Sequence, residues 1–301
     1  MVYTNLKSGL RAGADLHLLP EILPATAPGG EPPGLIGICE ARWWQHGGQS
    51  AAEAERYLKK VYGCEYRLKI GGIGRSDDPP ALAWRTDTFT WHGWNTPAND
   101  HHRYSHNTGL LAWADAPERV AVRVQVVHLD YASVDQRSIE AQTIAAQFDP
   151  DLANIVMGDF NSAPSGAHGG DRDWDTVPAH KRRHKARLVE RSPGQWGWVK
   201  DTVPLDTLIG PWDEHAQQRR TDLGAGYRTL AEIDWEQRGR PGGGLAGTTV
   251  NAQSLPIDHI LVDESTGLVP GSFTVHLNPH SDHGVLHAQT LVHPGRQPGE
   301  Q

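Results

Sequence analysis

The chain has 301 residues, of which 38% are hydrophobic and 21% charged, so it suits a soluble globular protein of one large domain or two small ones. Its formal charge of −8 argues against a passive high-affinity DNA binder, because no global basic field surrounds it, but not against an enzyme that meets phosphates through a metal ion. The only cysteines, Cys39 and Cys64, are too few for a disulfide framework or a cysteine-rich zinc site.

Targeting signals are not visible in the sequence. No apolar run approaches the ~20 residues of a membrane helix, so we expect no membrane span. No basic segment precedes an apolar stretch, so we expect a cytoplasmic protein, and we expect a monomer. Because Met1 leads almost directly into an apparent strand, the start is a place where residues, including a signal, could be missing.

In the first third of the chain, two predicted strands end in polar residues. Asn5 lies near the end of the first strand, and Glu40 ends an apolar strand as a lone carboxylate. A charge there is typical of a metal ligand at a strand tip, but many ordinary strands end in the same way. The pattern predicts strands at 2–6, 34–40, 81–85 and 89–91, a long loop at 20–33 and a helix at 51–62.

The middle of the chain predicts a hairpin followed by a helix. Strands at 109–113 and 120–127 turn around Asp115, and the second strand ends at His128. Ser133 is placed to cap a helix at 134–148, in which Ile139 and Ile144 lie near one face.

The segment around Asp159 is the one around which we expect the chain to be organised. A short apolar run at 155–157 predicts a buried strand that ends at Gly158. Asp159 and Asn161 follow and point to one face if the chain is extended. A carboxylate that orients a water or binds a metal, beside an amide that donates to a phosphate oxygen, suits phosphate ester chemistry. The alternative is a turn that either residue caps.

Residues 166–254 are irregular and rich in glycine and tryptophan, and we interpret them as an insertion in a single domain of residues 1–301. A basic, helix-like block at 180–191 is either a solvated helix face or a contact for a phosphate backbone. Regular patterns return after this segment, with predicted strands at 255–262, 272–277 and 285–292. The first of these strands carries Asp258, and the last follows His283.

Together these polar residues resemble, in this order, the endonuclease/exonuclease/phosphatase superfamily, which includes DNase I, exonuclease III-type repair nucleases, sphingomyelinases and inositol-polyphosphate phosphatases. The Gly-Asp-Phe-Asn element at 158–161 and the Ser-Asp-His element at 281–283 are the most specific parts. The resemblance implies an α/β (α+β) fold: a four-layer sandwich of two mostly antiparallel sheets packed face to face and flanked by helices. It also implies Mg²⁺-dependent hydrolysis of phosphodiester bonds, with Mn²⁺ as an alternative ion.

Residue roles follow from the resemblance. Glu40 would be the main Mg²⁺ ligand, with Asn5 and Asp282 close by, as ligands or through water. Asp159 would orient or activate the attacking water, and Asn161 would hold a phosphate oxygen.

The resemblance also assigns the histidines. His283 would contact the scissile phosphate, with its ring held by Asp258. His128 resembles the histidine of DNase I and the sphingomyelinases rather than the matching position of exonuclease III-type enzymes, and would protonate the leaving oxygen. The alternative for His128 is a hydrogen-bonded residue at a strand end. Apart from the resemblance, Arg103 and Asn107 are placed by their position in one loop to reach a phosphate.

The sequence therefore predicts a metal-dependent phosphodiesterase, foremost a DNase I-like endonuclease acting on DNA rather than RNA. The first alternative is a phosphatase or phosphodiesterase for a small or lipid phosphate, which the acidic net charge favours. A second alternative is a binding module that has lost its chemistry. The complete set of site residues argues against it, because a lapsed site has no chemical reason to keep them all.

Overall fold

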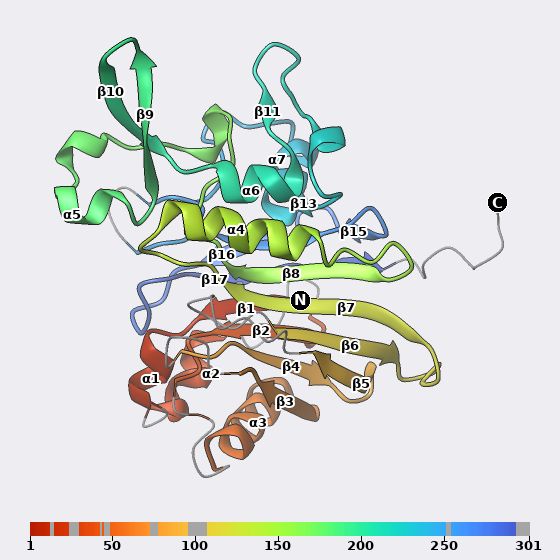
Figure 1. Cartoon of the computed structure of the whole chain (residues 1–301). Coiled ribbons are helices and arrows are strands. Elements are labelled where there is room, and N and C mark those ends of the chain that lie inside the picture. Colours follow the sequence, from red (N-terminus) through yellow and green to blue (C-terminus); the bar gives the residue numbers. More distant parts are fainter. Residues whose placement is uncertain are drawn as a thin grey trace, which may run out of the picture.

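Two six-stranded sheets lie at the centre of the computed structural model (Figure 1). The structure describes residues 1–12, 15–23, 30–42, 44, 49–72, 78–95, 107–250 and 254–292. Within these residues, no helix combines the length and the apolar character that crossing a bilayer requires.

The first sheet contains the N-terminal strands and is mostly antiparallel. Its order is β16 (Thr274–His276), β17 (Val285–His287), β1 (Val2–Asn5), β2 (Leu35–Cys39), β4 (Ala81–Arg85) and β3 (Tyr66–Ile70). Only β1 and β2 run parallel, with Asn5 opposite Cys39. Because both strands end at this pair, Asn5 and Glu40, which follows Cys39, reach the same edge of the sheet.

The second sheet contains the strand that ends at Asp159. Its order is β13 (Arg228–Thr229), β14 (Asp258–Val262), β8 (Ala153–Asp159), β7 (Val120–His128), β6 (Asn107–Trp113) and β5 (Phe89–Asn95). Only β7 and β8 run parallel, and β6 and β7 form the predicted hairpin. Both sheets are thus mostly antiparallel, as predicted.

Helices cover the outer faces of the two sheets, which confirms the four-layer sandwich. Apolar side chains of both sheets meet between them, and Met157 lies so close to Gly37 that a Cβ there would be 3.1 Å from its side chain. Outside the first sheet lie α1 (Ser8–Ala12), η1 (Leu16–Leu18), α2 (Leu19–Ile22) and α3 (Gln49–Tyr62). Outside the second sheet lie α4 (Val134–Ala145) and α6 (Val203–Ile209).

Several predicted elements differ from the structure. The loop predicted at 20–33 begins as helix, because Pro20 occupies the first turn of α2, where a missing N–H costs nothing. Ser133 caps α4 as predicted, but the helix ends at Ala145 and Ile139 is 53% exposed. The last predicted strand is divided between β17 and β18 (Thr290–Val292), which pairs with β15 (Thr266–Leu268) instead. The strand β3 was not predicted, although its apolar residues alternate with the exposed Arg67 and Lys69 as in a half-buried strand.

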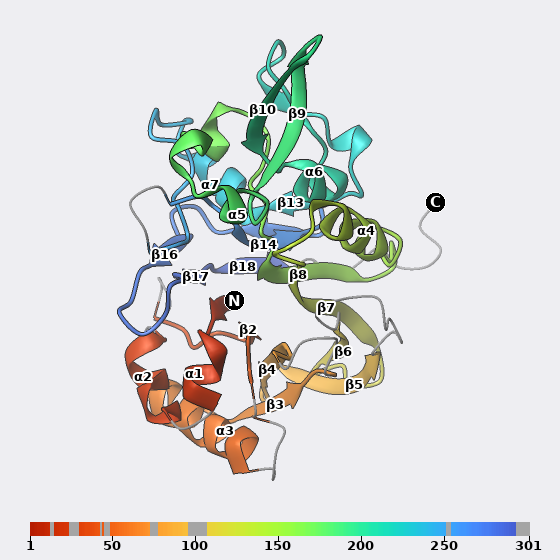
Figure 2. The same cartoon turned by 60° about the vertical axis from the view of Figure 1, so that its left-hand side comes forward.

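Residues 166–254 rise from the second sheet as short elements (Figure 2). The basic block at 180–191 is not one helix: it begins in α5 and ends in a strand that pairs with the following segment as a hairpin. The division into one domain with an insertion stays a prediction. The elements are η2 (Ala167–Gly169), η3 (Trp174–Thr176), α5 (Ala179–Arg182), β9 (Ala186–Ser192), β10 (Gln195–Lys200), β11 (Trp212–Asp213), β12 (Gln218–Arg219), η4 (Thr221–Leu223) and α7 (Leu230–Gln237).

Candidate active site

The predicted polar residues meet at one edge of the sandwich because of strand direction. In the second sheet, His128 and Asp159 lie side by side at the ends of parallel strands. Asp258 begins the antiparallel strand β14 opposite Asp159, so it reaches the same edge. Asn5 and Glu40 end the parallel strands β1 and β2 of the facing sheet.

Asp159 is the centre of this cluster and is only 2% exposed. Its Oδ2 atom accepts a hydrogen bond from Asn5 Nδ2 at 3.3 Å, across the two sheets. The same oxygen lies 3.5 Å from His128 Nε2 and 3.6 Å from His283 Nε2. Its Oδ1 atom accepts from the backbone N–H of Asn161 at 2.8 Å. One carboxylate oxygen is therefore faced by two imidazoles.

The electrostatics keep this carboxylate ionised. Burial alone would raise the pKa of Asp159, but His283 and His128, with smaller contributions from Lys185 and the Asn161 N–H, hold the pKa below its usual value. An ionised carboxylate can accept a proton or orient a water molecule.

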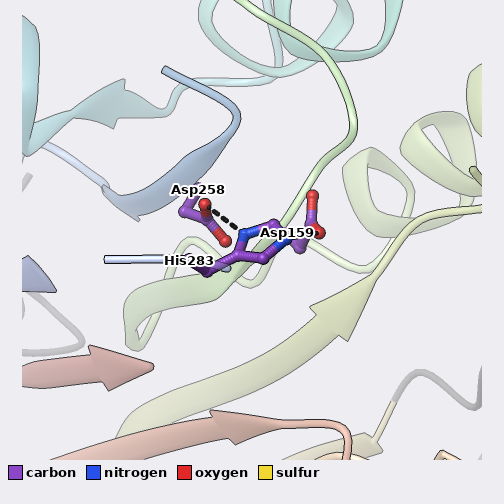
Figure 3. A group of neighbouring side chains, drawn as sticks. All are labelled: Asp159, Asp258 and His283. Atoms are coloured by element: carbon purple, nitrogen blue, oxygen red, sulfur yellow. Dashed lines mark hydrogen bonds and ion pairs between the residues drawn. The ribbon is translucent and has the colours of Figure 1, made fainter. Parts of the chain in front are cut away.

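His283 is held in place by a carboxylate, as Figure 3 shows. Its Nδ1 lies 2.8 Å from Asp258 Oδ2, and Asp258 Oδ1 accepts a hydrogen bond from the Tyr3 hydroxyl at 3.2 Å. Burial opposes the charged imidazole, but Asp258 and Asp159 outweigh it and raise the pKa of His283 to about 10. The ring is therefore protonated near neutrality, and Nε2 can donate a hydrogen bond to an anion.

Asn161 is held in a left-handed conformation, with φ of 47°. Asparagine tolerates this conformation better than most residues. One hydrogen bond of its amide goes from Nδ2 to Leu129 O at 3.0 Å, which fixes the side chain. The second N–H of the amide is left for another acceptor, so the predicted contact with a phosphate oxygen is chemically possible.

Glu40 and Asn5 have properties that fit a hard cation. Glu40 is half-buried with φ of 59°, and its Oε2 accepts from Ser8 N at 2.8 Å. Burial raises the pKa of Glu40 even though His128 opposes the shift, so a neighbouring cation would relieve the cost of its charge. Asn5 Oδ1 is buried and has no hydrogen-bond partner among the described residues. An amide oxygen without a hydrogen-bond partner, beside a carboxylate whose charge is disfavoured by burial, is a suitable donor set for Mg²⁺.

Asp282 lies next to this pair through its backbone. The Ser281 hydroxyl donates to Asn5 O at 2.7 Å, so the Ser-Asp-His element lies against the end of β1. The Asp282 side chain is exposed.

A second possible metal group consists of Asp159, Asp258 and His283, whose ligand atoms lie within 4.8 Å of one another. The hydrogen bond between Asp258 and His283 occupies one ligand atom of each, which favours the Glu40 group instead.

Arg103 and Asn107 are the other predicted substrate contacts. Arg103 lies outside the described residues. Asn107 is completely buried, and its Oδ1 accepts from Gly72 N at 3.0 Å, so it fixes the loop after β3. Its predicted role in substrate binding stays a prediction.

Sequence reasoning missed Tyr3, and it did not separate Lys185 from the other cations of the basic block. Tyr3 lies two residues before Asn5 on β1, so the alternation of side chains would have placed both on one face. Lys185 was one of several cations in the basic block, but its neighbours have internal partners. Arg182 Nε donates to Val177 O at 2.9 Å, and Arg187 Nε lies 3.1 Å from Asp201 Oδ1.

Comparison with known proteins is consistent with this geometry. A family model described as "Endonuclease/Exonuclease/phosphatase family" matches residues 3–283. No curated protein sequence matches the chain.

Three solved structures illustrate the likeness of fold. Humanized TDP2 from D. rerio has a TM-score of 0.54 at 12% sequence identity, and the match covers 97% of this chain and 98% of that one. ANGEL2, a 2',3'-cyclic phosphatase, has a TM-score of 0.53 at 16% identity, and the match covers 96% of this chain and 94% of that one. The 3'-5' exonuclease NExo from Neisseria meningitidis has a TM-score of 0.54 at 14% identity, and the match covers 96% of this chain and 99% of that one.

Proposed function

The chain belongs to the endonuclease/exonuclease/phosphatase family, and from this premise we propose that it is a Mg²⁺-dependent phosphodiesterase that cleaves DNA internally, like DNase I. Members of this family are metal-dependent phosphoric ester hydrolases. The observation that carries the proposal is the pair of imidazoles, His128 and His283, facing one oxygen of the ionised Asp159.

In this proposal Asp159 orients the attacking water and accepts its proton, because its carboxylate is held ionised. His283, held by Asp258, donates from Nε2 to a non-bridging oxygen of the phosphate, and Asn161 donates from its remaining N–H. These donors are fixed before substrate arrives, so they stabilise developing charge without rearrangement.

His128 would protonate the leaving oxygen. It is 4% exposed and lies at the level of Asp159 on the neighbouring strand, so it can approach the same phosphate. A divalent cation held by Glu40, Asn5 and Asp282 would add charge stabilisation at the phosphate and the leaving group.

The metal assignment predicts that Glu40→Gln weakens Mg²⁺ binding by about tenfold or more, because it removes one unit of negative charge from a hard-cation site. Calorimetric titration with Mg²⁺, and with Mn²⁺ as the second ion, measures the change, and turnover at limiting Mg²⁺ should fall with it.

Asp258→Asn is the matched control for this prediction. Its side chain is committed to His283 and Tyr3, so the variant should keep wild-type Mg²⁺ affinity. If Asp258→Asn lost the ion and Glu40→Gln kept it, the ion would belong to the group of Asp159, Asp258 and His283.

The substrate proposal rests on an exposed aromatic residue of the β9–β10 hairpin, whose base follows Lys185 and which rises away from the sheets in Figure 2. Trp196, near the tip of this hairpin, is 62% exposed, as suits stacking on a base. The net charge of −8 and the internal partners of Arg182 and Arg187 favour the second candidate, a phosphatase or phosphodiesterase for a small or lipid phosphate.

Substrate choice is tested by incubating the protein with supercoiled plasmid, RNA, sphingomyelin and inositol phosphates in Mg²⁺. We expect nicking and linearisation of the plasmid, because an endonuclease needs no free end. Hydrolysis of inositol phosphates or sphingomyelin with an intact plasmid would establish the second candidate instead.

A further inference from the structure

The segment that carries Lys185 is tied by hydrogen bonds to the loop of the catalytic residues. The backbone N–H of Asp201 donates to Lys185 O at 2.9 Å. The Ser162 hydroxyl, directly after Asn161, donates to Asp201 O at 2.7 Å. Two hydrogen bonds, both through the backbone of Asp201, therefore connect the Lys185 backbone to the loop that follows β8.

Arg137 makes the same connection from the other side. Its guanidinium is completely buried and donates to Asp130 O at 2.9 Å, two residues beyond His128. It also donates to Arg183 O at 3.2 Å and to Asp201 Oδ2 at 2.8 Å. The segment of Lys185 thus has a fixed position over both catalytic strand ends.

The ammonium group of Lys185 has neighbouring carboxylates but no ion pair. The charges of Asp159, Asp258 and Asp282 all act on it, although burial dominates and lowers the pKa of Lys185. In the described part of the chain, none of their oxygens lies within the 4.0 Å of an ion pair with it. Lys185 is therefore a half-buried cation that lies near three acids and forms an ion pair with none of them in the described part of the chain.

Arg172 lies near Lys185, and two of its guanidinium nitrogens lack an acceptor among the described residues. Its Nε and Nη2 atoms are buried without a hydrogen-bond partner among the described residues, and its guanidinium carbon lies 5.2 Å from the centre of the Trp174 ring. Trp174 packs in one cluster with Ala186, which follows Lys185, and Ile257, which precedes Asp258. The charge of Arg172 acts on Lys185.

Neighbouring cations repel each other, and buried guanidinium donors without acceptors are costly. We propose that Lys185 and Arg172 form a phosphate-binding subsite, in which Lys185 binds an oxygen of the scissile phosphate and Arg172 binds the adjacent phosphate of the substrate. The inference rests on the proposed function and narrows it to substrates with at least two phosphates in sequence, as in a polynucleotide.

Steady-state kinetics on two substrates test the subsite: a short DNA oligonucleotide, and bis(p-nitrophenyl) phosphate, which has a single phosphate. Lys185→Met should lower kcat/KM on both by about ten- to a hundredfold, the loss of one hydrogen bond to a charged group. Arg172→Gln should raise KM for the oligonucleotide by about tenfold and leave the small ester unchanged. Lys181→Met, an exposed cation of the same block, is the control and should match wild type on both.

Equal losses of Arg172→Gln on both substrates would overturn the assignment of a second phosphate. Wild-type constants for Lys185→Met would overturn the subsite, leaving Lys185 as a counter-charge to the acids. If Lys185→Met does not fold, Lys185→Gln serves in its place.

Calorimetric binding of inorganic phosphate, without divalent cation, separates the subsite from the proposed function. We expect wild type to bind phosphate, Lys185→Met to bind it at least about tenfold more weakly, and Arg172→Gln to bind it about as wild type does. If wild type hydrolysed neither substrate but this pattern held, the proposed function would fail and the subsite would stand. Equal phosphate binding by wild type and Lys185→Met would overturn the subsite whatever the activity.

Discussion

Replacing Asp159 by Asn is expected to lower kcat by about 10²- to 10⁴-fold, the range that a general base contributes. The amide keeps the shape of the side chain and its oxygen can still accept from the Asn161 N–H, but it cannot accept a proton from water. The loss is measured on a phosphodiester substrate at saturating Mg²⁺, with circular dichroism to confirm the fold. Because the charge acts on the reacting atoms, KM should change much less than kcat.

A matched control separates catalysis from burial of charge. Asp263 is also buried and follows the opposite end of β14, where its Oδ2 accepts from Asn154 N at 2.6 Å. Asp263→Asn should cost stability and leave kcat of the folded enzyme unchanged. If it lowered kcat as much as Asp159→Asn does, the Asp159 effect would be structural.

His283→Ala tests whether the residues around Asp159 act as a unit. The single variant should also lose orders of magnitude in kcat, since it removes a charged donor aimed at the same place. The double variant with Asp159→Asn should lose far less than the product of the two single losses. Fully multiplicative losses would mean that the two side chains act independently.

Replacing Arg137 by Met is expected to destabilise the protein by about 3–5 kcal/mol, the range for breaking a buried ion pair. Arg137 and Asp201 are both completely buried, and Arg137 donates to Asp201 Oδ2 through two nitrogens, at 2.8 and 3.0 Å. The variant leaves a buried carboxylate with only Arg187 beside it, at 3.1 Å. Urea denaturation measures the change in the free energy of unfolding.

The control for this prediction is an exposed pair. Arg220 and Asp222 lie 2.8 Å apart on the surface, and Arg220→Met should leave the free energy of unfolding nearly unchanged because solvent screens exposed charges. A loss for Arg137→Met as small as this would show that the buried pair contributes little. Adding Asp201→Leu to Arg137→Met should recover part of the loss, since no carboxylate is then left buried.

The amino-acid sequence by itself determined the strand ends at which the candidate catalytic groups lie. An apolar run that stops at Gly158, and polar residues that follow it, are local features that the order of residues shows directly. The same holds for Glu40 and His128, each placed after a hydrophobic run. Strand direction then brings these ends to one edge, and the family resemblance supplied the pairing of Asp258 with His283, which lie 2.8 Å apart.

Only the tertiary structure decided how the cations of residues 166–254 are used. A run of basic residues reads as a helix face, yet half of it pairs with β10 as a strand, because hairpin partners are set by the chain beyond the run. Arg137 and Asp201 are 64 residues apart, and hydrophobic periodicity cannot predict that two charged groups are buried together. Their contacts hold the segment of Lys185 beside the loop that follows β8, while Arg182 donates to backbone carbonyls. The position of each cation relative to the candidate site therefore depends on long-range contacts between charged groups, a property that no single segment carries.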